Sequence, residues 1–527
     1  MQFPSLLIAG LLATFPLLAA DVAIHDVQGP GAESPRAGQS ISTTGVVTAR
    51  RTNGFFLQAP DTEADADPLT SEGVFVFTSS MPPSSAAVGN RVRVTGTVLE
   101  YRPSSDPASP PLTEIAGNPG VTFLSLGTAL PSPVVLSAAD LSPSTPSGRL
   151  ERCEGMRVRV DSLLVVAPTG GTVDEANGTA MSNGVFFGVL TGTPRPFREA
   201  GADAGIALPA GSPCCVPRFD GNPERLRVDS DGLIGVAALD VAAGSTLAGL
   251  VGPLDYAYRT YTLLPESVPA VSGASTARAV PHPRSGELTV GFLNLEYFFD
   301  ATPSAAGPTL TPEAYETRLK KASLAIRTIL RTPGVLAVAE VESLPVLQAL
   351  AARISADALA AGGNDPRYAA FLEEGNDQSG IDVGFLVAPA VRVGSVVQEG
   401  KATTYLDPVA GTAATLNDRP PLVLAARATA PDGTEVPFTV VVNHLRSLTG
   451  VAEDSSTGRR VRAKRQAQAE YLAGLLSRLQ AASPDVPLLA VGDFNAFDVS
   501  DGLVDVLASR AARTWSMSWA FPSKTYE

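Results

Sequence analysis

Short runs of alternating apolar and polar residues fill the chain from about 23 to 123. Clear examples are Ser40 to Arg50, Gly54 to Pro60, Gly73 to Ser79 and Arg91 to Tyr101. Clusters of Gly, Pro and Asp separate them. Alternation with a period of two indicates β-strands, and closely spaced turn residues favour a small barrel. We therefore predict a first β-barrel at residues 23–125.

The aromatic residues of this region lie inside the alternating runs. They are Phe55, Phe56, Phe75 and Phe77. Because successive side chains of a strand point to opposite faces, we interpret them as core residues, with a platform for nucleic-acid bases as the alternative.

A second, looser β pattern extends from Cys153 to about Pro265. It contains the segments CEGMRVRVDSLLVV, GVFFGVL and AYRTYTLLP. The theme of a short strand, a glycine turn and a closing Tyr-rich strand recurs, which favours a second barrel-like domain at residues 150–266. A stretch rich in Pro, Ser and Ala then predicts a linker at residues 268–285.

After Gly286 the pattern changes to alternating strands and helices. Thr311 and Pro312 are typical of a helix start, and the apolar face that follows is Tyr315, Leu319, Ala322, Ile326 and Ile329. VLAVAEV (Val335 to Val341) reads as a short buried strand, another helix starts near Leu344, and IDVGFLV, FTVVVNHL and VPLLAVGDFN supply further strands. This alternation predicts an α/β layered domain over residues 286–527.

Composition is consistent with a folded chain of several domains. Of the 527 residues 44% are hydrophobic and only 17% are charged, with 48 Gly and 44 Pro. The formal net charge of -14 repels polyanions at long range, which argues against tight, charge-driven nucleic-acid binding. A nucleic acid would therefore be a substrate that the protein contacts only locally.

The N-terminal residues 1–20 form an apolar run that ends in Leu18, Ala19 and Ala20. This predicts a signal peptide and a secreted, extracellular protein, with the periplasm as a second location and a buried N-terminal strand or helix as the alternative interpretation. No later stretch reaches the roughly 18 apolar residues that a membrane span needs.

Three cysteines occur, Cys153, Cys214 and Cys215, without zinc-type spacing. In an exported protein, a disulfide between Cys153 and one of the other two is predicted. The alternative is that all three are small buried hydrophobic residues.

Polar residues occur at strand ends throughout the α/β region. They are Asn294, Glu340, Asp382, His444, and Asp493 with Asn495. One polar residue at a strand end is usually a cap or turn residue. Phosphodiester hydrolysis, however, needs a hard cation, an activated water and hydrogen-bond donors, and carboxylates, amides and imidazoles supply all three. The co-occurrence predicts one shared site.

The order of motifs NLEYFFD, AEVES, DQSGIDVGFLV, VVNHLRS, KRQAQAEYL and VGDFNAF resembles the endonuclease/exonuclease/phosphatase superfamily, and its bacterial extracellular-nuclease branch most closely. The N-terminal sequence also resembles the OB-fold module of that branch, through IHDVQGPGAESPRAGQ followed by GVFVFT. The resemblance implies a multidomain fold class: OB-like β-barrel modules followed by an α/β four-layer sandwich of two packed mixed sheets flanked by helices.

The resemblance also implies roles at the metal. Glu340 matches the principal ligand of Mg²⁺, with Mn²⁺ or Ca²⁺ as alternatives, and Asn294 matches the amide beside the metal and the phosphate. Asp493 matches the carboxylate that places or activates the attacking water. Asn495 matches the amide that binds the phosphate.

Further roles concern the imidazole and the flanking phosphates. His444 matches the donor to the phosphate or leaving group, and Asp382 falls where the family places the carboxylate that orients this imidazole and raises its pKa toward the protonated form. Arg446, Arg462 and Arg465 are predicted to contact flanking phosphates. A solvated helix face is the alternative for the basic cluster around the last two.

The superfamily ends in a strand with a Ser-Asp-His signature, which this sequence does not contain. By resemblance we expect a C-terminally incomplete domain, and little or no turnover from these 527 residues. The predicted function is a metal-dependent nuclease that hydrolyses extracellular DNA, or RNA, to 5'-phosphate products, as a monomer without an obligate protein partner. Alternatives are a phosphodiesterase or phosphatase on lipid or inositol phosphates, and an inactive surface or nucleic-acid-binding protein.

Overall fold

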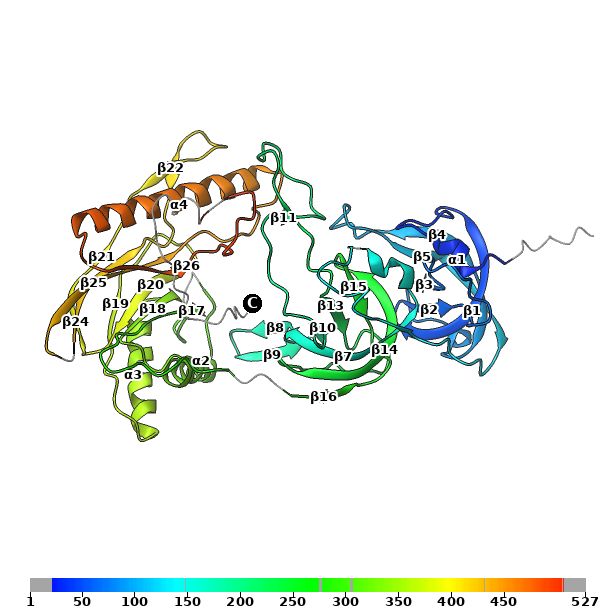
Figure 1. Ribbon diagram of the computed structural model, residues 1–527, viewed down its shortest axis with the longest axis horizontal. Coiled ribbons are helices and arrows are strands. Elements are labelled where there is room, and N and C mark those ends of the chain that lie inside the picture. The colour runs from blue at the N-terminus through cyan, green and yellow to red at the C-terminus, as the bar shows by residue number, and fades with distance from the viewer. Residues whose placement is uncertain are drawn as a thin grey trace, which may run out of the picture.

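The computed structural model describes residues 21–146, 148–273, 277–303, 307–430, 432–504 and 506. The predicted signal peptide lies outside these residues. The protein is rich in β-sheet, with two barrel-like units on one side and an α/β unit on the other (Figure 1). Within the described part of the chain, no helix has the length and apolar character required to cross a membrane.

The first unit is a closed five-stranded barrel with the order β1-β2-β3-β5-β4. Strands β3 and β5 are parallel, and the other neighbours are antiparallel. Its elements are α1 (Ile24–Gln28), β1 (Ser40–Arg51), β2 (Gly54–Gln58), β3 (Gly73–Phe77), η1 (Ser84–Ala86), β4 (Arg91–Tyr101) and β5 (Leu112–Ser125).

The aromatic residues of this region lie in two apolar clusters. Phe55 packs inside the barrel, whereas Phe56 and Phe75 pack against Leu233 and Leu264 of the second unit. Phe55, Phe56 and Phe75 are at most 3% exposed. Their burial confirms the core interpretation and removes these rings as platforms for nucleic-acid bases.

The second unit repeats the strand order of the first. Strand β7 pairs with β10, β10 with β13, β13 with β15 in parallel, β15 with β14, and β14 again with β7. Its elements are β6 (Val134–Val135), η2 (Arg149–Cys153), β7 (Arg157–Ala167), β8 (Gly171–Asp174), β9 (Thr179–Ser182), β10 (Val185–Leu190), β11 (Ala202–Asp203), β12 (Arg218–Phe219), β13 (Leu226–Asp229), β14 (Thr246–Ala257), β15 (Thr260–Leu263) and β16 (Ala270–Ser272).

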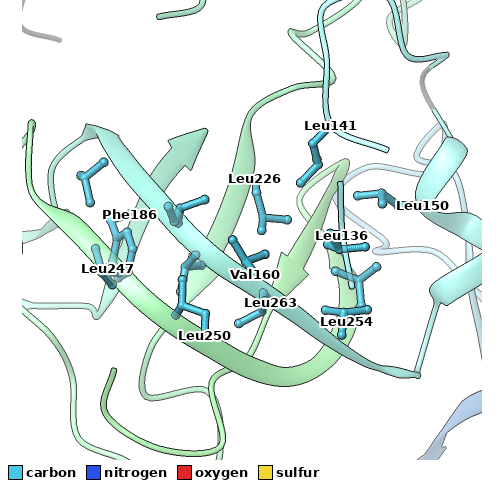
Figure 2. Packing of buried hydrophobic residues seen from close by; sticks show 14 of the residues in the cluster. Leu136, Leu141, Leu150, Val160, Phe186, Leu226, Leu247, Leu250, Leu254 and Leu263 are labelled. Atoms are coloured by element: carbon cyan, nitrogen blue, oxygen red, sulfur yellow. The ribbon is translucent and has the colours of Figure 1, made fainter. Parts of the chain in front are cut away.

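Figure 2 shows the core of this second ring, where Val160, Phe186, Leu250 and Leu263 point inward from different strands. Each of the four is at most 1% exposed, and burying such side chains contributes roughly 1.5–3 kcal/mol apiece. The stretch expected to be only a linker contributes a strand, because β16 pairs with β14.

The predicted disulfide is absent from the structure. Cys153 is fully buried in the core of the second ring, whereas Cys214 and Cys215 are exposed, and all three are free. Burial raises the pKa of the Cys153 thiol to about 11. Cys153 therefore behaves as a small core residue, the alternative raised from the sequence.

The α/β unit contains two four-stranded sheets, with the orders β17-β18-β20-β19 and β21-β24-β25-β26. Its elements are β17 (Val290–Phe298), α2 (Pro312–Leu324), the π-helical η3 (Ala325–Ile329), β18 (Val335–Val341), α3 (Leu344–Ala360), β19 (Ala369–Leu372), β20 (Asp382–Val387), β21 (Val391–Gln398), β22 (Thr404–Leu406), β23 (Ala413–Thr415), β24 (Leu422–Thr429), β25 (Glu435–His444), α4 (Ser456–Ala482) and β26 (Leu488–Asp493).

Three large apolar clusters hold this unit together. One lies between the two sheets and joins Ala337 of β18 and Phe385 of β20 to Val440 of β25. The second packs α2 and α3 on the outer side of the first sheet, and the third packs α4 on the outer side of the second. Asn294 from the middle of β17 and polar residues near the ends of β18, β25 and β26 therefore lie close together.

Candidate metal centre

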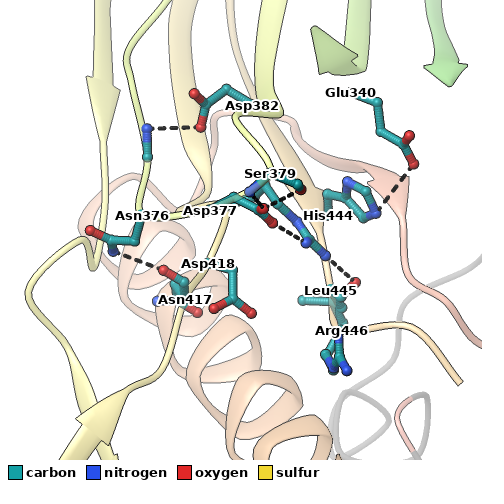
Figure 3. A network of polar contacts seen from close by, with 12 residues as sticks. Glu340, Asn376, Asp377, Ser379, Asp382, Asn417, Asp418, His444, Leu445 and Arg446 are labelled. Atoms are coloured by element: carbon teal, nitrogen blue, oxygen red, sulfur yellow. Dashed lines mark hydrogen bonds and ion pairs between the residues drawn. The ribbon is translucent and has the colours of Figure 1, made fainter. Parts of the chain in front are cut away.

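Three strand ends bring two carboxylates and an imidazole together. Glu340 lies near the end of β18, His444 ends β25 and Asp493 ends β26. One ligand atom from each lies within 4.8 Å of the others. The Nε2 atom of His444 is 3.8 Å from Oε1 of Glu340 and 3.9 Å from Oδ2 of Asp493. Figure 3 shows His444 and Glu340 pointing toward each other.

The parallel pairing of β25 and β26 places His444 directly beside Asp493. Gly492 makes this approach possible. Its φ is 138°, and a Cβ built there would lie 2.0 Å from the main-chain oxygen of Asn443. Only glycine fits this backbone and this contact, so the glycine of the VGDFN motif fixes the position of the following carboxylate.

Glu340 is presented by an irregularity in its strand. Its φ is 61°, and the pairing of β18 with β20 shifts register between Ala339 and Val341. The Oε2 atom of Glu340 accepts a hydrogen bond of 3.0 Å from the main-chain N–H of Tyr297. A bulge in this position re-aims a side chain, and a non-glycine residue in the left-handed region is typical of a functional site.

Asn294 connects the two carboxylates. Its Nδ2 donates to Oε1 of Glu340 at 2.9 Å and to Oδ2 of Asp493 at 3.2 Å. Its Oδ1 accepts from the main-chain N–H of Glu296 at 2.9 Å, which fixes the orientation of the amide. The structure thus brings four predicted residues into one cluster.

His444 is only 5% exposed. Burial lowers its pKa to about 4, and the charge of Arg419 acts in the same direction. The expectation of a raised pKa is therefore wrong, because desolvation outweighs the nearby carboxylates. Within the described residues, the buried Nδ1 atom has no hydrogen-bond partner.

Asp382 is not hydrogen-bonded to this imidazole in the described structure. Its Oδ1 accepts from the main-chain N–H of Gly375 at 2.8 Å, and burial raises the pKa of its carboxyl to about 7. In this geometry the Asp382 carboxylate holds the loop before β20, and a role in orienting His444 stays a prediction.

Asn495 lies just beyond the cluster, with φ at 45°. Its Nδ2 donates to the main-chain oxygen of Leu445 at 2.9 Å, and its N–H donates to Oδ1 of Asp493 at 2.8 Å. The side-chain amide therefore ties the loop after β26 to the loop after β25. Phosphate binding by this amide stays a prediction.

The three arginine side chains that were predicted to contact phosphates differ in their surroundings. Arg465 is 1% exposed and donates to the main-chain oxygens of Arg446 and Asn495, so it is committed to the framework of the site. Arg462 donates to the main-chain oxygens of Val451 and Glu453. The side chain of Arg446 lines a cavity.

Sequence reasoning missed Asp377 and Arg419. An ion pair joins them, and Arg419 also donates to the main-chain oxygen of Leu445 at 3.0 Å, next to His444. Asp377 stands in the DQSG motif, which could have drawn attention to it. No local pattern marks Arg419.

A second group of ligand-type side chains lies in the first barrel, where His25, Asp65 and Glu72 approach one another. Here Nδ1 of His25 is already hydrogen-bonded to the Glu72 carboxylate, at 3.0 Å from Oε1. The main-chain N–H of Asp65 donates to the same oxygen at 2.6 Å. These internal hydrogen bonds account for the cluster.

Comparison with known proteins gives a family model for the second unit. A domain of unknown function (DUF8508) matches residues 149–273. No curated protein matches the chain.

Solved structures match parts of the chain. TDP2 from Caenorhabditis elegans is 16% identical over 36% of this chain and 45% of that one, with a TM-score of 0.23. A hairpin-deletion mutant of beta toxin from Staphylococcus aureus is 14% identical over 43% and 73%, with a TM-score of 0.27. ANGEL2, a 2',3'-cyclic phosphatase, is 14% identical over 35% and 44%, with a TM-score of 0.22. The chain thus spans less than half the length of TDP2 and of ANGEL2.

These matched proteins have folds of the endonuclease/exonuclease/phosphatase type.

Proposed function

We propose that the α/β unit is a divalent-metal-dependent phosphodiesterase that hydrolyses nucleic acid, DNA before RNA, and leaves 5'-phosphate products. One observation carries the proposal: ligand atoms of Glu340, His444 and Asp493 lie within 4.8 Å of one another at the ends of three strands. Two packed sheets flanked by helices, the four-layer arrangement, are the scaffold we infer for this site.

The side chains fit a hard cation. Two carboxylates offer oxygen atoms, which Mg²⁺ and Mn²⁺ prefer. The separations of 3.8 Å and 3.9 Å between His444 and the carboxylates are too long for hydrogen bonds, so these groups are not satisfied by one another. Glu340 and Asp493 would hold the ion, and Nδ2 of Asn294 would keep both carboxylates in place. A bound ion would neutralise phosphate charge and lower the pKa of water.

The chain's own residues would orient the phosphate. Asn294 is held by three hydrogen bonds, and Glu340 is held by the amide of Asn294 and the N–H of Tyr297. Such fixed groups need no reorganisation during reaction. His444, whose pKa burial lowers to about 4, can donate a hydrogen bond through Nε2 to a phosphate oxygen.

The strand order of the first barrel supports a nucleic-acid substrate. A closed ring of five strands in the order β1-β2-β3-β5-β4 is compatible with an OB-fold, a scaffold that often carries oligonucleotide sites. We propose that this unit, and the second unit with the same order, are OB-like modules of a secreted nuclease.

The experiment uses protein made from the complete coding sequence. Release of acid-soluble nucleotides from plasmid DNA is measured with Mg²⁺ and with EDTA, and sphingomyelin is offered in parallel. We expect DNA hydrolysis that EDTA abolishes and that falls at least about a hundredfold in Glu340→Gln. Hydrolysis of sphingomyelin alone would favour a lipid phosphodiesterase, and inactivity on both would favour a binding protein.

Two variants serve as matched controls. Glu72→Gln removes a carboxylate from the other ligand-type cluster, in the first barrel, and should leave hydrolysis unchanged. Glu470→Gln changes an exposed carboxylate on α4 and should also have no effect.

A further inference from the structure

A polar cavity of about 450 Å³ lies next to the candidate metal centre. Asp377 from the loop before β20, Arg419 from the turn before β24, and Arg460 and Lys464 from α4 line it. The wall also includes Arg446, two residues beyond His444. A cavity of this volume falls within the range of small-molecule sites.

Arg446 is the lining residue with an unused charge. Its main chain is fixed from both sides, because its N–H donates to Oε1 of Gln468 at 2.7 Å and its oxygen accepts from Arg465. Among the described residues, its half-buried guanidinium has neither a hydrogen bond nor an ion pair. Figure 3 shows this side chain extending away from Glu340, beyond the end of β25. A pre-positioned guanidinium without a partner is suited to an anionic ligand.

The other cations of the cavity are already paired. Arg460 contacts Asp407 at 2.8 Å and Lys464 contacts Asp418 at 2.6 Å. These pairs hold the first turns of α4 against the loops on the opposite wall. They leave Arg446 as the group with which a ligand would form a new bond.

Tyr405 of β22 adds an aromatic ring to the same cavity. The ring is half-buried, so one part of it faces open space. Aromatic rings of this kind stack with nucleic-acid bases at a gain of about 1–3 kcal/mol per base, with little preference for sequence.

We propose that this cavity is a nucleotide subsite, in which Arg446 binds the phosphate of a nucleotide neighbouring the cleaved bond and Tyr405 contacts its base. A guanidinium can hold two phosphate oxygens in a fork, which fixes the register of the strand. The inference rests on the proposed function, since it names how the same enzyme would hold its substrate.

The test measures binding of thymidine 5'-monophosphate by calorimetry in EDTA, so that no metal takes part. We expect a loss of at least about tenfold in affinity in Arg446→Ala and about fivefold in Tyr405→Ala. Arg459→Ala removes the same charge from an exposed position of α4 that does not line the cavity, and should bind as the wild type does. Arg446→Lys keeps the positive charge but cannot hold two phosphate oxygens in a fork. Its affinity for the nucleotide should lie between those of the wild type and Arg446→Ala.

Two further measurements separate this subsite from the metal centre. Binding of Mn²⁺ should be retained in Arg446→Ala and Tyr405→Ala, which also shows that both variants are folded, and should be lost in Glu340→Gln while nucleotide binding persists. Wild-type protein that does not bind the nucleotide, equal binding in all variants, or equal affinity for inorganic phosphate would overturn the subsite. Wild-type protein that binds the nucleotide but not Mn²⁺ would support the subsite while contradicting the metal centre.

Discussion

His444 and Asp493 end two neighbouring parallel strands in register, so that Nε2 of one lies 3.9 Å from Oδ2 of the other. Their distance is set by the backbone pairing of β25 and β26, and not by a hydrogen bond between them. A site built on paired strands is held by the sheet core, where Val440 and Val442 are fully buried. Disturbing the pairing should therefore disturb the site.

Gly492→Ala should lower both stability and metal affinity. The new Cβ would collide with the main-chain oxygen of Asn443, which forces β26 away from β25 beside Asp493. We expect a fall in the free energy of unfolding of roughly 1–3 kcal/mol and a loss of Mn²⁺ affinity of at least about tenfold. Urea unfolding and calorimetry would measure the two effects.

Gly474→Ala is the matched control for this change. Gly474 lies inside α4, and its Cβ would approach only the Arg478 side chain, at 3.6 Å. Alanine favours a helix by about 1 kcal/mol over glycine, so this variant should be slightly more stable and bind metal normally. Equal losses in both variants would contradict the role given to Gly492.

Arg465→Met should destabilise the loops around the site. The fully buried guanidinium donates to the main-chain oxygens of Arg446 and Asn495, and methionine would leave both acceptors without these bonds. We expect a loss of roughly 2–4 kcal/mol in the free energy of unfolding. The exposed Arg459→Met should stay within about 0.5 kcal/mol of the wild type. A neutral Arg465→Met would show that these bonds contribute nothing.

Stability should decrease as pH rises toward neutrality. Burial, aided by the charge of Asp255, raises the pKa of Glu114 from 4.5 in the unfolded chain to about 7 in the folded one. The folded state therefore binds a proton that the unfolded state has lost. The contribution is complete below pH 4.5 and disappears as pH rises toward 7.

The variant Glu114→Gln isolates this effect. One pKa unit corresponds to about 1.4 kcal/mol, so the wild type should lose up to roughly 3 kcal/mol more than this variant between pH 4.5 and 7.5. Urea unfolding at several pH values measures the difference. Parallel pH profiles for the two proteins would contradict the assignment, and Asp454→Asn, at an exposed position, should match the wild-type profile.

Much of the local structure follows from the sequence. The predicted strand from Val335 to Val341 is β18 with the same bounds, and Thr311 caps α2 by accepting from the N–H of Ala314 at 3.2 Å. The strand follows from its short run of apolar residues, and the cap follows from a threonine, a residue type that favours helix N-termini. The two β-rich units were predicted for the same reason.

Other features depend on contacts that no local pattern records. The left-handed backbone at Glu340 arises where β18 pairs with both β17 and β20, and the lowered pKa of His444 arises from burial by distant segments. The family resemblance suggested Asp382 as the partner of the histidine, whereas the folded loop turns its carboxylate to Gly375. Such partners are set by tertiary packing.

The most direct test of the metal centre is the binding of Mn²⁺ to the wild type, Glu340→Gln and Glu72→Gln, followed by electron paramagnetic resonance and calorimetry. We predict that the wild type and Glu72→Gln bind the ion alike, and that Glu340→Gln loses at least about a hundredfold in affinity, because it removes the carboxylate that Asn294 and Tyr297 hold in place. Equal binding by all three proteins, or loss only in Glu72→Gln, would contradict the assignment of Glu340, His444 and Asp493 as one metal centre.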